Sequence, residues 1–208
     1  MAPDPSRARG GDEDPVMRAA LAGAIAAAMS VATTVFVDGA WPAAPSLVLA
    51  IGQAVIRIAP GDASRAGIDT FGTADKPLLV AGVVVLAVAV GAASAHRSRR
   101  AFEITTSVAA AVGVVAAVTV HDAGWFPSLV AGGLSALAGI AVHAALRAAA
   151  EQGPVTTSML SRRRFLAAST GAAGGAALVA LTGRTLLRVG AAEAARAGVT
   201  LPRPRSGA

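Results

Sequence analysis

The sequence predicts an all-α fold, a polytopic membrane bundle of five transmembrane helices with one short interfacial helix on the outer side. Hydrophobic residues make up 54% of the 208 residues and charged residues only 14%, whereas a soluble domain carries roughly 25% charged residues. The apolar residues are also concentrated in long blocks, which is the pattern of transmembrane helices. We therefore expect an integral membrane protein surrounded by a lipid bilayer.

Five apolar blocks are long enough to cross about 30 Å of hydrocarbon as helices. They are predicted at residues 16–37, 77–95, 101–120, 128–146 and 165–183. The first four form a membrane region over residues 16–147. Residues 1–15 mix Pro, Gly, Asp and Arg without periodicity and predict a disordered cytoplasmic tail. Residues 148–164 are predicted to be a cytoplasmic connection, and residues 184–208 an extracytoplasmic tail.

The segment "SLVLAIGQAVIRI", residues 46–58, lies between Pro45 and Pro60. A helix of this length reaches about 20 Å, which is too short to span a bilayer. Gln53 and Arg57 share one helical face, which favours an interfacial or re-entrant helix. A loop segment packed against the bundle is the alternative.

The distribution of positive charge predicts the orientation. If the N-terminus is cytoplasmic, the outer connections hold only Arg57, Arg65 and Lys76 as cations, and Trp41 and Trp125 lie at the outer interface. The inner connections then hold seven arginines: Arg97, Arg99, Arg100, Arg147, Arg162, Arg163 and Arg164. We expect a multi-pass protein of the bacterial plasma membrane with a cytoplasmic N-terminus and an extracytoplasmic C-terminus.

Composition also excludes some classes of function. The net charge of +6 does not indicate nucleic-acid binding, because the arginines lie at the ends of apolar blocks and aromatic residues, which would stack on bases, are only 3% of the chain. The chain has no cysteine. Disulfides, thiolate-bound iron–sulfur clusters and cysteine-ligated metals within this chain are therefore excluded.

The fifth apolar block follows a motif that is typical of export signals. Its hexamer "SRRRFL" matches the S-R-R-x-F-L pattern of twin-arginine signals at every fixed position, and the block after it is weakly apolar and rich in Ala and Gly, as in such signals. The candidate signal residues are Ser161, Arg162, Arg163, Phe165 and Leu166. We expect the twin-arginine translocation machinery to be a partner of this segment.

The same stretch allows a simpler interpretation. Three arginines before an apolar helix are also an ordinary positive flank. In that interpretation Gly171-x-x-x-Gly175 would be a face for close helix packing.

Two pieces of the chain carry a resemblance to a known family: Thr70–Pro77, "TFGTADKP", and the hexamer Ser161–Leu166, followed by a tail that reaches "LPRPR". Over roughly residues 16–204 the chain resembles the N-terminal membrane region of actinobacterial molybdopterin-dependent oxidoreductases related to sulfite oxidase. The resemblance implies a membrane anchor and export-signal region for such an oxidoreductase, with the molybdenum cofactor held in an exported domain beyond these helices.

That catalytic domain is not among the 208 residues, and without cysteine the thiolate that ligates molybdenum in that family cannot come from them. We therefore predict no catalytic, cofactor-binding or metal-binding residue in this chain, and expect the chain alone to be non-catalytic. A truncated or split gene is one explanation for a membrane region without its catalytic domain. The alternative function is a free-standing small membrane scaffold or docking subunit for a separate redox partner.

A few titratable residues near the predicted spans were candidates for chemistry. His96 and His143 fall near the inner ends of the second and fourth spans, so one hypothesis is a bis-histidine haem; helix-end histidines are the alternative. His121 falls at the opposite face. Glu103 follows Arg99 by four residues, which predicts a local ion pair, with a proton relay as the alternative.

Overall fold

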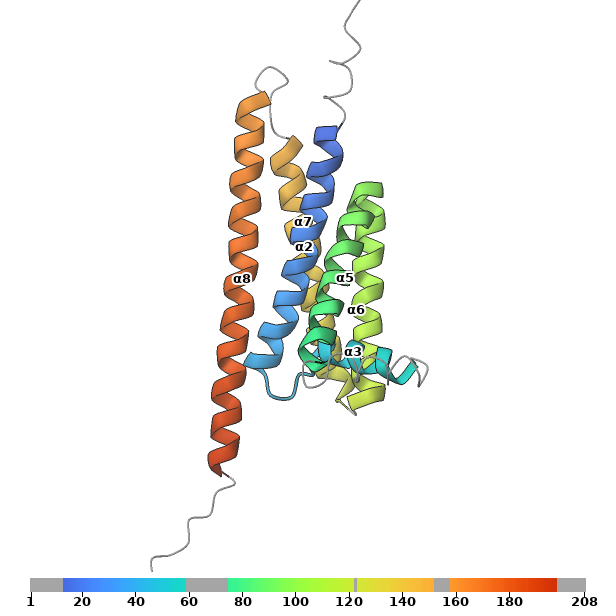
Figure 1. The fold of residues 1–208 in the computed structure, drawn as a ribbon, viewed down its shortest axis with the longest axis vertical. Helices are drawn as coiled ribbons and strands as arrows, with labels where there is room; N and C mark the ends of the chain where they lie inside the picture. Colours follow the sequence, from blue (N-terminus) through green and yellow to red (C-terminus); the bar gives the residue numbers. More distant parts are fainter. Residues whose placement is uncertain (1–12, 59–74, 122, 152–157, 198–208) are drawn as a thin grey trace, which may run out of the picture.

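The structure, a computed structural model, describes residues 13–58, 75–121, 123–151 and 158–197 (Figure 1). In these residues it contains helices and no strand, so the predicted all-α class is confirmed. The helices are α2 (Glu13–Ala40), α3 (Leu47–Ile58), α5 (Asp75–Arg97), α6 (Arg99–His121), α7 (Trp125–Glu151) and α8 (Ser158–Ala197).

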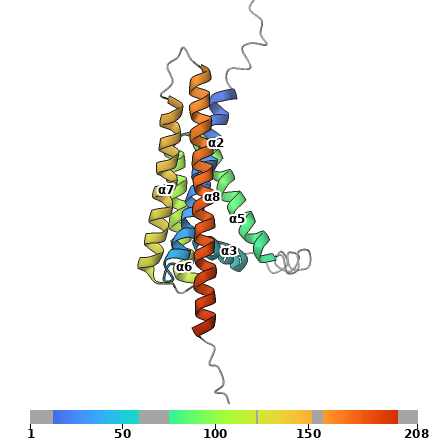
Figure 2. The same ribbon diagram turned by 90° about the vertical axis from the view of Figure 1, so that its left-hand side faces the viewer.

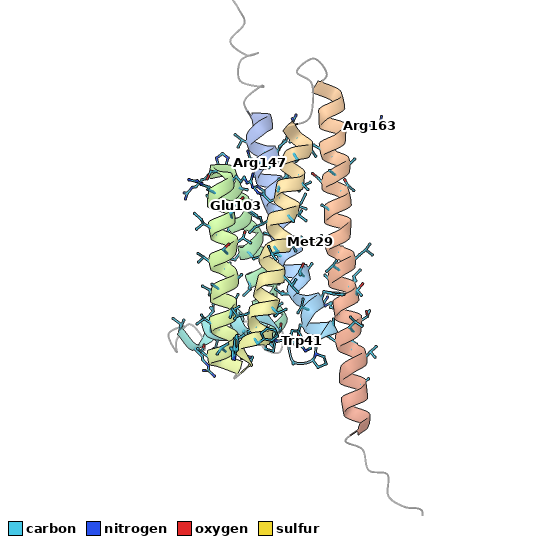
Figure 3. All side chains as sticks on the ribbon, turned by 180° about the vertical axis from the view of Figure 1, so that it is seen from behind. Met29, Trp41, Glu103, Arg147 and Arg163 are labelled. Carbon is cyan, nitrogen blue, oxygen red and sulfur yellow. The ribbon has the colours of Figure 1, made fainter. Side chains whose placement is uncertain are left out.

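Five of these helices are long and apolar enough to cross a membrane, as predicted: Val16–Ala40, Val80–Arg97, Arg99–Val120, Trp125–Ala150 and Phe165–Gly190. Successive long helices run in opposite directions (Figure 1). One end of the bundle therefore collects Arg147 and Arg163, and Trp41 lies at the other end (Figure 3). We call these the arginine-rich end and the tryptophan end.

The tryptophan end carries an aromatic cluster. The ring centroids of Trp41 and Phe126 are 6.4 Å apart, and those of Trp125 and Phe126 are 5.9 Å apart. Trp41 follows α2 directly, whereas the other two rings begin α7. Trp41 and Trp125 therefore lie at the same end of the bundle, and their predicted location at the outer interface stays a prediction.

Helix α3 lies across the tryptophan end, at a steep angle to the long helices (Figure 1). Its first half is buried, with Leu47 and Ala50 packed in a core cluster with α6 and α7. Its last four residues, 55–58, are exposed and apolar except for Arg57, and Ile58 is 84% exposed. The Ser46 side chain hydrogen-bonds the Asp38 carboxylate just before the helix begins. The predicted short helix therefore exists, and the loop alternative for residues 46–58 is wrong.

Helix α8 is much longer than the predicted span of residues 165–183. It has 40 residues, so it begins inside the predicted connection and continues through Ala197. At 1.5 Å per residue it is about 60 Å long, twice the thickness of the hydrocarbon core. Figure 2 shows it running along the whole bundle and past the tryptophan end. The extension is explained by Leu, Arg, Ala and Glu after Gly183, all good helix formers.

Helix α2 is the central helix and packs against α5, α7 and α8. Each of these contacts contains glycine. Gly23 of α2 meets Gly91 of α5, Gly139 of α7 meets Ser30 of α2, and Gly39 of α2 meets Gly183 of α8. The Ser135 hydroxyl of α7 also donates a 2.8 Å hydrogen bond to the carbonyl oxygen of Ser30. Small residues let helix backbones approach closely, which is the main source of helix association in lipid.

The contact between α2 and α8 leads to a test by single substitutions. A Cβ on Gly183 would lie 2.6 Å from the Val35 carbonyl oxygen and 2.7 Å from Phe36 Cα, both backbone atoms of α2. We expect Gly183→Ala to destabilise the bundle by about 1–3 kcal/mol because the helices must separate. The measurement is the free energy of unfolding in detergent micelles.

The matched control lies on the same helix. Nothing is within 4 Å of a Cβ placed on Gly171. Gly171→Ala should therefore be neutral or stabilise by up to about 1 kcal/mol, because alanine favours helix. Equal destabilisation by the two substitutions would contradict the close contact at Gly183.

Candidate functional site

The predicted export hexamer lies in the first turns of α8, at the arginine-rich end. Arg163 is exposed and points away from the bundle (Figure 3). Leu166 is 51% exposed, whereas Phe165 is only 2% exposed. Ser161 and Arg162 belong to the helix, but their side chains are outside the described residues. The hexamer therefore presents Arg163 and Leu166 outward and turns its aromatic ring inward.

Phe165 fixes the start of α8 to the bundle. It forms a core cluster with Ala22 of α2 and Leu146 of α7, and partly buried apolar residues such as Ile25 and Val142 pack around it. Sequence reasoning identified Phe165 as part of a signal and not as a packing residue. The structure shows the packing role, and the signal role stays a prediction.

The alternative interpretation placed a close-packing face at Gly171 and Gly175 of α8. The structure does not show a close helix approach there. Gly171 faces open space, and a Cβ on Gly175 would meet only the flexible end of Met29, at 3.6 Å. The close approach to α2 occurs instead at Gly183. The sequence carries no local signal for this choice, since Gly183 stands alone at the end of the weakly apolar block.

A cavity of about 650 Å³ opens beside the hexamer at the arginine-rich end. Its wall includes His96, and its floor includes Ala22, Leu146 and Phe165. It is lined by five arginines, which come from α2, the junction of α5 and α6, and α7: Arg18, Arg97, Arg99, Arg100 and Arg147. The structure thus brings together four of the arginines predicted to share one face and adds Arg18, which sequence reasoning had not included.

The predicted ion pair of Glu103 is confirmed. Arg99 Nε donates a hydrogen bond to Glu103 Oε1 at 2.6 Å. The pair spans one turn of α6, and the Arg99 side chain is well exposed. The pair is therefore a surface contact within α6, and its Arg99 also lines the cavity.

The two histidines of the haem hypothesis have different surroundings. His96 is exposed and lines the cavity. His143 is 2% exposed, does not line that cavity, and stacks on the fully buried Phe102 with ring centroids 4.2 Å apart. This arrangement does not favour a haem shared by the two imidazoles. The Phe102–His143 stack was missed by sequence reasoning, although Phe102 is the one aromatic residue of α6.

The described residues also offer few side chains that could ligate a metal ion together. Among the described residues no group of three or more His, Asp or Glu side chains is placed to hold a metal ion. The chain has no cysteine. A thiolate ligand for the molybdenum cofactor that the resemblance implies is therefore not available within these 208 residues.

Comparisons of the chain with protein-family models, with curated proteins and with solved structures found no match. The functional argument therefore depends on the hexamer, its position on α8 and the charges around it.

The geometry of Phe165 and Leu166 gives a test by adjacent substitutions. Phe165→Ala removes a buried ring at the contact of α8 with α2 and α7 and should destabilise the bundle by about 3 kcal/mol. Leu166→Ala removes a smaller, exposed side chain and should have an effect below about 1 kcal/mol. Thermal unfolding of the purified protein in detergent measures both. Equal effects would show that Phe165 is not a packing residue.

Proposed function

We propose that this chain is the membrane anchor and twin-arginine export-signal region of a molybdopterin-dependent oxidoreductase. The observation that carries the proposal is the hexamer Ser161–Leu166 at the head of α8, at the same end of the bundle as the other arginine clusters. The resemblance of residues 16–204 to the membrane region of that family supplies the class of enzyme. The molybdenum site belongs to a domain that is not among these residues.

The packing of α8 leaves most of its surface outside the bundle. The main packing partners of α8 among the other long helices are α2 and α7. Its apolar span is also one of the two least buried of the five. In α8, 17% of the apolar stretch is buried inside the bundle, compared with 39% in α2. Because Phe165 is buried in the assembled bundle, we propose that the translocation machinery reads the hexamer before α8 docks. A domain attached after α8 would then lie on the side opposite the hexamer.

The export proposal predicts a dependence on the arginine pair. The test fuses the full chain to a reporter that is active only outside the cytoplasm and is exported only in the folded state. Arg162→Lys with Arg163→Lys should abolish export, because the twin-arginine address is read by a receptor and not only by charge. The measurement is reporter activity in intact cells.

The matched control makes the same change on the other end of the helix. Arg184→Lys with Arg188→Lys should leave export unchanged, since both residues are exposed and lie outside the hexamer. Undiminished export of the 162/163 variant would contradict the export function and leave only the positive-flank interpretation.

Orientation is the second consequence of the proposal. The arginine-rich end should face the cytoplasm and the tryptophan end the exterior, because positive flanks are retained on the cytoplasmic side. Because the chain has no cysteine, a single cysteine added after Ala208 should react with a membrane-impermeant maleimide in intact cells, whereas one added before Met1 should not. The reverse pattern would invert the topology.

The oxidoreductase part has its own test. Protein purified from its native membranes should carry molybdopterin, measured as the fluorescent pterin released after oxidation. Pterin on the same polypeptide, shown by tracking an N-terminal tag, supports the anchor. Pterin on a separate polypeptide would instead favour the docking-subunit alternative, and its absence from both would contradict any link to such an enzyme.

A further inference from the structure

The arginine-lined cavity lies at the level where the membrane spans begin and end. Arg18 is near the start of the α2 span, Arg97 ends the α5 span, and Arg99 begins the α6 span. Arg147 is near the end of the α7 span, and Phe165 is the first residue of the α8 span. The cavity is therefore at the depth of the lipid phosphates on this face of the bundle.

The cavity has two chemically different parts. Its rim is cationic and includes Arg97 and Arg100, both exposed at a helix end. Its floor is apolar and is made by Ala22, Leu146 and Phe165, three residues that form one buried cluster. A ligand that fits both parts has a negative charge on one side and an apolar body on the other.

We propose that this cavity binds the headgroup of an anionic phospholipid. The phosphodiester would lie among the arginines at the rim, and the glycerol and first acyl carbons would cover the apolar floor. Basic pockets between transmembrane helices are suited to anionic lipid headgroups, and arginine matches a phosphate with two parallel donors. A free phosphate would use the rim but leave the floor uncovered. The binding goes beyond the proposed export function and does not depend on it.

Glu103 limits the charge of the site only in part. Its carboxylate is engaged by Arg99, and among the residues that line the cavity none is acidic. The lining therefore carries a strong net positive charge, which a phosphate-bearing lipid reduces. The volume of about 650 Å³ is sufficient for a headgroup with its glycerol but not for two acyl chains.

Native mass spectrometry of the delipidated full chain in detergent tests the proposal. The probes are dioleoyl phosphatidylglycerol, dioleoyl phosphatidylcholine and inorganic phosphate. We expect one phosphatidylglycerol to bind in preference to phosphatidylcholine. Arg97→Gln with Arg100→Gln should weaken its binding by on the order of tenfold, because each arginine near an anionic headgroup contributes to affinity.

The control variant removes the same charge elsewhere. Arg184→Gln with Arg188→Gln, exposed on the distal part of α8, should bind phosphatidylglycerol like the parent chain. Arg147→Gln is a second variant of the cavity lining and should also weaken phosphatidylglycerol binding. An unfolding temperature equal to that of the parent chain would show that a cavity variant has lost binding and not folding.

Three results would overturn the proposal. One is equal binding of the two lipids by the parent chain. Another is equal weakening by the cavity and control variants. The third is displacement of phosphatidylglycerol by millimolar inorganic phosphate, which would show that the rim recognises phosphate without the lipid body.

Discussion

The close approach of α2 to its neighbours is the constraint on which the rest of the structure depends. Inside a bilayer, lipid tails are as apolar as the side chains, so burial of apolar surface contributes little free energy to helix association. Association then requires backbones near enough for dense van der Waals contact. The pairs Gly23–Gly91 and Gly39–Gly183 allow this close approach of the backbones. Large apolar side chains such as Leu137 and Leu178 are left exposed on the outside, where lipid would cover them.

This constraint explains how α8 is attached. Phe165 fills a site between α2 and α7 at one end, and Gly183 meets α2 at the other. The two contacts are 18 residues apart, so they are separated by about 27 Å along the helix. Between them, Gly171 and Gly174 have nothing within 4 Å of an added Cβ. A helix with so weak an apolar core gains little from lipid alone. The packing of α8 continues between these two points, where Gly175 lies against Met29 and Ala168 and Ala172 pack beside the Phe165 cluster, and this contact holds α8 along α2.

Local patterns in the sequence predicted much of this fold, and tertiary contacts account for what they missed. The five spans, the short helix at the tryptophan end and the Arg99–Glu103 pair each depend on neighbours within one element. The Gly39–Gly183 contact and the Phe102–His143 stack join residues that are far apart in sequence. No periodicity within a single helix encodes such a pairing. The hexamer Ser161–Leu166 was predicted as an export motif from its local pattern, but the burial of its aromatic ring depends on two other helices.

The arginine-rich end shows how one set of charges fixes several properties together. Five arginines line one cavity, where like charges repel one another, and Glu103 forms an ion pair with one of them, Arg99. Such a cluster would be strongly unfavourable in hydrocarbon, but water and lipid phosphates reduce its repulsion at the membrane surface. The cluster therefore fixes the depth of the helix ends. Phe165 forms part of the cavity floor. The same cavity surface therefore also fixes the depth of the first turns of α8, which carry Arg163.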